Sequence, residues 1–197
     1  MASLGRQSEK RAAIEAGVLQ ATEELLAEGA TFAELGIERI ATRAGISRTA
    51  FYFYFRDKRE LLVRLTEEVN GQLMVAADSW WSGGEDIRGA LRRVGAIFAE
   101  HGLLLRAVVE VSTYDEAVAQ FWRGQVGRFA DATRVRIEDE QQAGRALPGD
   151  PAAIAFSLVW MTERAFYQQR VQGRPETVDE LVEALATIFT RTVYGGS

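Results

Sequence analysis

The chain is predicted to fold as an all-α protein of about nine helices. Apolar residues recur three or four positions apart along most of its 197 residues, which is the period of a helix with one buried face. Glycine and proline interrupt this pattern at intervals, and no segment has the character of a strand. We expect two units, a three-helix N-terminal domain over residues 1–57 and a larger helical domain over residues 58–197.

Each expected helix has its own start or stop signal. The first covers residues 9–28, where Ile14, Val18 and Leu25 share a face; it ends at Gly29, and the polar residues 1–8 are expected to fray. Two short helices within residues 37–53 precede a long one over residues 58–80, which Asp57 can cap. Its length, roughly 30 Å, would let it leave the first unit and enter the second. The remaining helices are expected over residues 87–102, 103–111, 115–142, 151–172 and 175–194.

Residues 37–58, IERIATRAGISRTAFYFYFRDK, carry the most specific local pattern. A short helix breaks near Ala44, and Gly45 can adopt the positive φ that a tight turn needs. Ser47 stands at the N-cap position of a second short helix. Helix, glycine-containing turn and capped helix form a helix-turn-helix, whose second helix lies in the major groove of DNA. The first unit is therefore predicted to bind DNA.

The second helix of this motif holds five aromatic residues in a row, Phe51 to Phe55, among several arginines. Phe51 and Phe55 are four positions apart, so both should face the core. Tyr52 and Tyr54 carry hydroxyl groups that can bond to phosphate oxygens. The net charge of the chain is −5, but the first 60 residues carry nine basic and nine acidic side chains, and the basic ones crowd the motif. A local basic patch is sufficient for phosphate binding.

Composition excludes several classes of chemistry. The chain has no cysteine, which rules out disulfides, cysteine zinc sites and thiol catalysis, and its single histidine, His101, is expected at the surface or at a helix end. Glu138, Asp139 and Glu140 diverge around a helix axis, so a solvated face is favoured over a metal site. The sequence has no run of eighteen apolar residues and no signal peptide, so we expect a cytoplasmic protein that needs neither metal nor cofactor.

Residues 44–61, AGISRTAFYFYFRDKREL, resemble the signature of the TetR family of bacterial transcriptional regulators. The doubled Phe-Tyr, the run MTER at residues 161–164 and the pair Tyr194-Gly195 are similar to the EthR-type branch, whose members bind apolar ligands. The resemblance implies a homodimeric repressor that binds a pseudo-palindromic operator, with its last two helices forming a four-helix dimer interface. It also implies control by a small apolar or aromatic effector.

The resemblance also implies which residues contact DNA. Groove-facing positions of the family are matched by Arg48, Thr49 and Phe53. Phosphate-contacting positions are matched by Tyr52, Tyr54 and Lys58; Arg43 is placed to reach the backbone, and Ser47 completes the candidate set. The chain departs from the family pattern at Gly36, where a capping Ser or Thr is frequent, and at Ala50, where a Thr is common. Both departures remove a hydroxyl group that could contact DNA.

Large aromatic rings are frequent in the second unit, and such rings more often belong to plain core than to a pocket. In EthR-like proteins, rings of this kind line a ligand tunnel, and positions of that tunnel are matched by Trp122, Phe129, Val159, Thr162 and Phe189. Further candidate ligand-binding residues are Trp80, Phe98, Phe156, Trp160 and Phe166. At Val159 and Thr162 the relatives carry amides that hydrogen-bond the ligand, so we expect the polar part of the ligand to differ here.

Two alternatives remain open. A TetR-like regulator could sense a protein, or nothing at all, with its pocket filled by side chains; a melting shift across an apolar compound library would distinguish these cases. An all-helical enzyme that uses Asp and Glu for acid–base or Mg²⁺ chemistry is disfavoured, because no paired acidic motif recurs on two helices.

Overall fold

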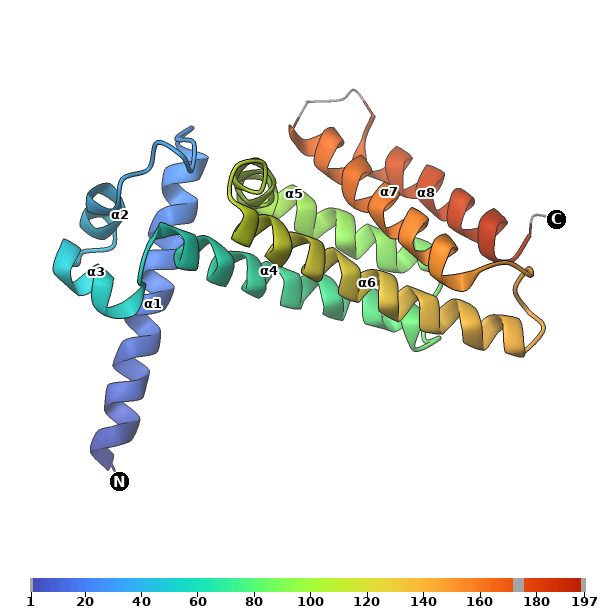
Figure 1. Cartoon of the computed structure of the whole chain (residues 1–197), viewed down its shortest axis with the longest axis horizontal. Helices are drawn as coiled ribbons and strands as arrows, with labels where there is room; N and C mark the ends of the chain where they lie inside the picture. The colour runs from blue at the N-terminus through green and yellow to red at the C-terminus, as the bar shows by residue number, and fades with distance from the viewer. Residues whose placement is uncertain (1, 172–175, 196–197) are drawn as a thin grey trace.

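The computed structural model describes residues 2–171 and 176–195, and within these ranges the chain forms eight helices and no strand. In chain order they are α1 (Ala2–Ala27), α2 (Ile37–Arg43), α3 (Arg48–Tyr54), α4 (Lys58–Trp81), α5 (Ile87–Val111), α6 (Glu116–Gln142), α7 (Pro151–Val171) and α8 (Val178–Val193). Figure 1 shows α1 to α3 as a separate lobe at the N-terminal end of the molecule. Helix α4 leaves this lobe and runs into the bundle formed by α5 to α8.

The N-terminal lobe follows the local signals of its sequence. Gly45 has a φ of +69°, and the next residue, Ile46, donates from its backbone nitrogen to the carbonyl of Ala41 at 3.0 Å, which closes α2. Ser47 then accepts a hydrogen bond from the backbone nitrogen of Ala50 at 3.1 Å and caps α3. These contacts confirm the predicted helix-turn-helix.

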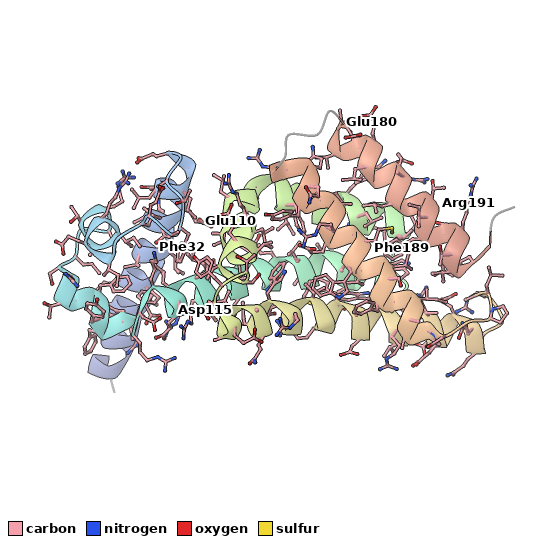
Figure 2. All side chains as sticks on the ribbon, turned by 45° about the horizontal axis from the view of Figure 1, so that its top comes forward. Phe32, Glu110, Asp115, Glu180, Phe189 and Arg191 are labelled. Atoms are coloured by element: carbon pink, nitrogen blue, oxygen red, sulfur yellow. The ribbon has the colours of Figure 1, made fainter. Side chains whose placement is uncertain are left out.

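The aromatic pair of α3 forms the centre of this lobe. Phe51 and Phe55 are both fully buried, and their ring centroids lie 5.3 Å apart, which confirms the inward orientation expected from their spacing. The same hydrophobic core continues without a break through α4 into the bundle, where it includes Leu105 and Leu185. Phe32, labelled in Figure 2, lies in this core between the lobe and the bundle. The two parts therefore share one core.

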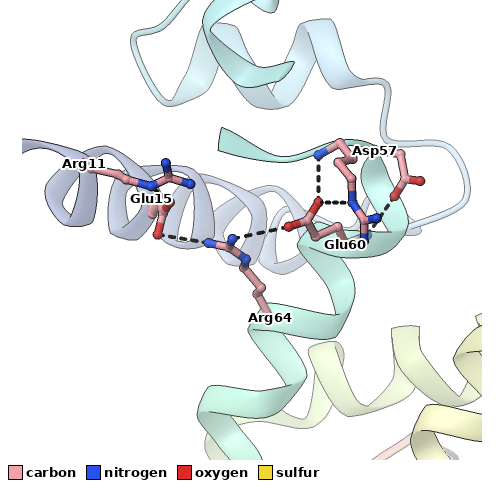
Figure 3. A network of polar contacts seen from close by, with 6 residues as sticks. Arg11, Glu15, Asp57, Glu60 and Arg64 are labelled. Atoms are coloured by element: carbon pink, nitrogen blue, oxygen red, sulfur yellow. Dashed lines mark hydrogen bonds and ion pairs between the residues drawn. The ribbon is translucent and has the colours of Figure 1, made fainter. Parts of the chain in front are cut away.

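The first turn of α4 is held to α1 by a chain of ion pairs. Asp57 caps α4 by accepting from the backbone nitrogen of Glu60 at 2.8 Å. Arg64 bridges Glu60 at 3.3 Å and Glu15 of α1 at 3.0 Å, as Figure 3 shows. Each pair is partly exposed and contributes little alone, but the network fixes the direction in which α4 leaves the lobe.

The helix count differs from the expectation because the predicted helices over residues 87–102 and 103–111 form one helix with a kink. The kink lies at His101, whose φ of −102° and ψ of 17° are not helical. Gly102 therefore follows a bend instead of ending a helix; the apolar face continues on both sides, through Phe98 and Leu104. Helix α1 begins at Ala2, so residues 2–8 are helical where fraying was expected.

The predicted start of the last helix, at Pro175, lies outside the described residues. In the described part, α8 begins at Val178. It is preceded by a capping box in which Thr177 and Glu180 satisfy each other's backbone nitrogens.

Glu140, expected on a solvated face, is buried, and His101, expected at the surface or at a helix end, lies at the kink of α5. The ring of His101 is mostly buried, and its Nδ1 lies 3.3 Å from a carboxylate oxygen of Glu23 on α1. Glu140 is 3% exposed and is ion-paired with Arg136 and Arg145, each at 2.7 Å. His101 and Glu23 are 78 positions apart, so no sequence pattern connects them, whereas Arg136 and Glu140 are an i, i+4 pair on α6. Among the described residues, no helix is long and apolar enough to cross a membrane.

Candidate functional site

Helix α3 presents an exposed face made of four residues that the sequence predicted to contact DNA. Arg48, Thr49, Tyr52 and Phe53 are all exposed, and Phe53 is 72% exposed. The ring of Phe53 meets the ring of Tyr54 edge to face, with the centroids 5.2 Å apart, and most of its surface is left open to solvent. The guanidinium of Arg48 lies over the ring of Tyr52, 5.9 Å from its centroid, so the two side chains are held together on this face.

Two further residues predicted to contact DNA, Ser47 and Tyr54, make contacts within the N-terminal lobe. Ser47 is used as the N-cap of α3, so its oxygen is already engaged with the backbone of Ala50. Tyr54 is half-buried, and the guanidinium of Arg11 on α1 lies 5.9 Å from the centroid of its ring. Ser47 thus stabilises the start of α3, and Tyr54 joins α3 to α1.

Arg43 forms ion pairs with residues of its own chain. Its guanidinium is 2.8 Å from a carboxylate oxygen of Glu28 and 3.4 Å from one of Glu24, both on α1. The hydrogen bond to Glu28 raises the pKa of this guanidinium further above its ordinary value. In this conformation the charge of Arg43 is balanced by α1, and a phosphate would have to compete with two carboxylates.

Lys58 also forms its hydrogen bonds within its own chain. Its Nζ donates to the carbonyls of Phe32, Ala33 and Leu35 at 2.8, 3.0 and 3.1 Å, which uses all three of its protons. Burial lowers the pKa of the ammonium group. Lys58 thus ties the start of α4 to the loop between α1 and α2. Sequence reasoning missed this role because no local pattern links residues 23 to 26 positions apart.

An apolar cavity lies among the helices of the bundle, between α4, α5, α6, α7 and α8. The volume of this cavity is about 90 Å³. Its wall contains six aromatic residues, Trp80, Trp81, Phe98, Trp122, Phe129 and Phe189. Trp80 and Phe189 meet edge to face, with their centroids 5.8 Å apart, and Figure 2 shows Phe189 on α8 within the bundle.

Comparison with known proteins places these two features in one family. The family model for bacterial regulatory proteins of the tetR family matches residues 18–65, and the model for the C-terminal domain of the transcriptional regulator EthR matches residues 87–195. The HTH-type transcriptional regulator EthR of Mycolicibacterium smegmatis is 33% identical over 192 residues, which cover 92% of this chain and 86% of that protein.

The chain belongs to the TetR family, in the EthR branch. EthR of Mycobacterium tuberculosis is 28% identical over 185 residues, covering 89% of this chain and 85% of that protein. The fold also matches SmeT, a repressor from Stenotrophomonas maltophilia, in its complex with triclosan. That match has a TM-score of 0.75 and 18% identity, and covers 92% of each chain. This TetR-family chain is therefore a DNA-binding transcriptional regulator and not an enzyme.

Seven of the ten predicted ligand-binding residues of this TetR-family protein line the cavity: Trp80, Phe98, Trp122, Phe129, Val159, Thr162 and Phe189. The other three are placed elsewhere. Phe166 is buried behind the wall and stacks on Phe98 at 5.4 Å, while Phe156 is 59% exposed and lies 6.2 Å from the ring of Trp160. Trp160 is partly buried and packs against the core, but it does not line the cavity.

The two predicted cavity residues Val159 and Thr162 offer a ligand few polar contacts. The hydroxyl of Thr162 donates to the carbonyl of Leu158 at 2.8 Å, so it can only accept from a ligand, and Val159 offers no polar atom. Asn70 and Glu163 also line the cavity, and both are buried. Burial raises the pKa of the Glu163 carboxyl above its ordinary value. Sequence reasoning missed both residues; a polar residue within an apolar helical face was the available signal.

Proposed function

We propose that this regulator is a homodimeric repressor whose binding to its operator is controlled by a small molecule in the bundle cavity. The observation that carries the proposal is the combination of an exposed aromatic and basic face on α3 with a separate apolar cavity reached by α4. A structural relative, SmeT, has been solved with the small molecule triclosan. The aromatic and apolar lining of this cavity suits an apolar or aromatic effector.

The two domains have different functions. Residues 1–57 form the domain that reads DNA, and residues 58–197 form the domain that binds the effector and the second copy. Each copy inserts α3 into the major groove of one half-site, and the half-sites of the pseudo-palindrome lie about 35 Å apart or a multiple of that. Arg48, Thr49 and Phe53 reach the groove, while Tyr52 and Tyr54 approach phosphates. Arg43 reaches the backbone where it exchanges its partners on α1.

Helix α4 transmits the signal. Its first residue, Lys58, is bonded to the loop of the DNA-reading domain, and its second half contributes Leu73 and Trp80 to the wall of the cavity. An effector that widens the cavity displaces α4 and with it the spacing of the two reading helices. To change the population from 1:99 to 99:1, the effector must bind the released state about 5.5 kcal/mol more tightly.

The proposal is tested with the purified protein. Selection of bound fragments from genomic DNA should yield a pseudo-palindromic site, and a labelled copy of that site should bind one or more dimers in a fluorescence anisotropy titration. A library of apolar compounds should contain members that raise the melting temperature and lower operator affinity together. A protein that binds the operator but responds to no compound would instead be a regulator without a small-molecule effector, and a protein that selects no site would refute the proposal.

A further inference from the structure

Two polar side chains in the cavity wall lack the hydrogen bonds that buried polar groups require. Asn70 on α4 is 1% exposed and Glu163 on α7 is 7% exposed. Among the described residues, neither the amide nitrogen of Asn70 nor either carboxylate oxygen of Glu163 has a hydrogen-bond partner. Burying such groups is costly, and more so for a charged one, so both weaken the fold instead of supporting it.

Several other buried polar side chains in this bundle have hydrogen-bond or ion-pair partners. Thr66 donates to a carbonyl of its own helix at 2.7 Å, and Thr133 accepts from the indole nitrogen of Trp81 at 3.1 Å. Glu140, which is as buried as Glu163, is paired with two arginines at 2.7 Å. The fold can thus satisfy a buried carboxylate where the chain supplies a partner, and at Glu163 it does not.

The nearest cation of the protein does not fill this role. Nε of Arg164 lies 3.7 Å from Oε2 of Glu163, which is beyond hydrogen-bond length, and about half of the arginine side chain is exposed to solvent. Arg164 is turned instead toward Tyr167, with its guanidinium 4.9 Å from the centroid of that ring. Its charge lowers the pKa of Glu163 by less than burial raises it.

The rest of the wall suits a cation as well. Rings from four helices face the same cavity, among them Trp80, Trp122 and Phe129, and the faces of such rings attract positive charge most strongly when water is excluded. A buried carboxylate inside an aromatic wall combines the two interactions that select an ammonium group over a neutral or anionic one. The free amide nitrogen of Asn70 adds one donor for an acceptor atom elsewhere in the ligand.

We propose that the effector of this regulator is a cationic amphiphile, an amine with an aromatic or apolar body, whose ammonium group binds Glu163 while the body lies against the rings of the cavity. This inference rests on the proposed function, since it specifies the ligand of the same cavity. An anionic ligand would meet the carboxylate of Glu163 with like charge, and a purely apolar one would leave the carboxyl and the Asn70 amide unpaired.

The test compares three probes of the same shape, 4-phenylbutylamine, 4-phenylbutan-1-ol and 4-phenylbutanoic acid, by calorimetric titration of the full-length protein at neutral pH without DNA. The amine should bind at least about tenfold more tightly than the alcohol, and the acid should bind most weakly. Glu163→Gln keeps the shape of the side chain and removes its charge, so it should abolish the advantage of the amine and leave the affinity for the alcohol within about twofold.

The matched control is Glu67→Gln, which makes the same charge change at an exposed position of α4 that does not line the cavity. It should preserve the preference for the amine, and melting curves of both variants verify that they fold. Equal binding of amine and alcohol, tighter binding of the acid, no binding of the amine at millimolar concentration, or a preference that survives Glu163→Gln would each overturn the inference. If the alcohol binds well and releases the operator, the regulator proposal stands while the cationic ligand is refuted. Failure to bind any operator refutes the regulator proposal alone.

Discussion

At the scale of single residues, the carboxyl group of Glu163 connects stability to ligand binding. Its pKa is raised in the folded protein by burial, with Arg164 opposing and the phenol of Tyr167 as a neutral neighbour. Below the pKa of the unfolded chain the group is neutral in both states and adds no cost of ionisation. As the pH rises through the higher pKa of the folded state, the buried group must ionise and stability is lost.

We therefore expect Glu163→Gln to become more stable than the parent as the pH rises from about 4 to 8, with the two converging at the acid end. Melting temperatures measured by circular dichroism over this pH range test the prediction. Glu67→Gln, at an exposed position, should show no comparable divergence. A parent and a Glu163→Gln variant that keep a constant difference at every pH would show that burial does not perturb this carboxyl.

Lys58 and Arg48 are both basic residues of the recognition motif, but the structure gives them different partners. Lys58 donates to three backbone carbonyls, whereas Arg48 lies over Tyr52 on the exposed face of α3. We expect Lys58→Met to lower the free energy of unfolding by about 1–3 kcal/mol, because three carbonyls lose their donor. Arg48→Ala should leave the melting temperature unchanged and relax the sequence preference of DNA binding.

The salt dependence of operator binding separates the two roles. A residue that neutralises one phosphate contributes roughly 0.9 to the slope of log affinity against log salt. If Lys58 holds the loop and does not contact DNA, Lys58→Met at a temperature where the variant is folded should keep the slope of the parent. A slope reduced by about one would assign Lys58 to a phosphate, as the family resemblance implies.

At the scale of helices, the close packing of α5 depends on a glycine. A Cβ at Gly95 would lie 2.9 Å from Cγ1 of Val178 and 3.0 Å from Cε1 of Phe166, so α5 could not keep its distance from α7 and α8. We expect Gly95→Ala to cost about 1–3 kcal/mol through overpacking. Gly124, exposed on α6, has no atom within 4 Å of an added Cβ.

The matched variant Gly124→Ala should therefore gain about 0.5–1 kcal/mol from helix propensity. Urea unfolding of the two variants should give changes of opposite sign. If both alanines stabilise the protein, the space around Gly95 can accept a Cβ, and α5 can move relative to its neighbours.

How much of this structure could be predicted depends on whether the signal was local. The turn at Gly45, the cap at Ser47 and the burial of Phe51 follow from residues a few positions apart, and all three were predicted. The continuity of α5 was not, because Gly102 is a common helix stop and only contacts with other helices keep the chain helical beyond it. The partners of Lys58 and His101, and the burial of the Glu163 carboxyl, also depend on segments far apart in the sequence.

Only part of the cavity could be predicted, because its lining also depends on contacts between segments far apart in the sequence. A period of 3.6 residues places Val159 and Thr162 on one face of α7, but it does not say which of several apolar faces is turned inward. Phe156 and Trp160 were therefore grouped with the cavity, although Phe156 is exposed and Trp160 packs against the core outside the cavity wall. Only the packing of α7 against α5 and α6 decides between these faces.

At the scale of the whole molecule, one continuous core joins the DNA-reading lobe to the bundle, and polar contacts reinforce the junction. Arg59, at the start of α4, is 2.7 Å from the carboxylate of Asp115, the N-cap of α6, which Figure 2 labels close to α4. His101 at the kink of α5 contacts Glu23 of α1. These contacts would transmit the displacement of α4 that the proposed function requires to the lobe.

The proposed dimer gives the last prediction. Phe156 on α7 is 59% exposed and Ile188 on α8 is 41% exposed, and in a homodimer formed by these helices both would be covered by the second copy. We expect Phe156→Glu with Ile188→Glu to produce a folded monomer in sedimentation velocity, because buried unpaired carboxylates oppose association. Affinity for the full operator should fall by roughly 10²-fold or more, since two linked reading helices bind far more tightly than one. Val75→Glu is the control, because Val75 is 76% exposed on α4. A monomer produced by Val75→Glu, and a dimer retained by the double variant, would place the interface on α4 instead.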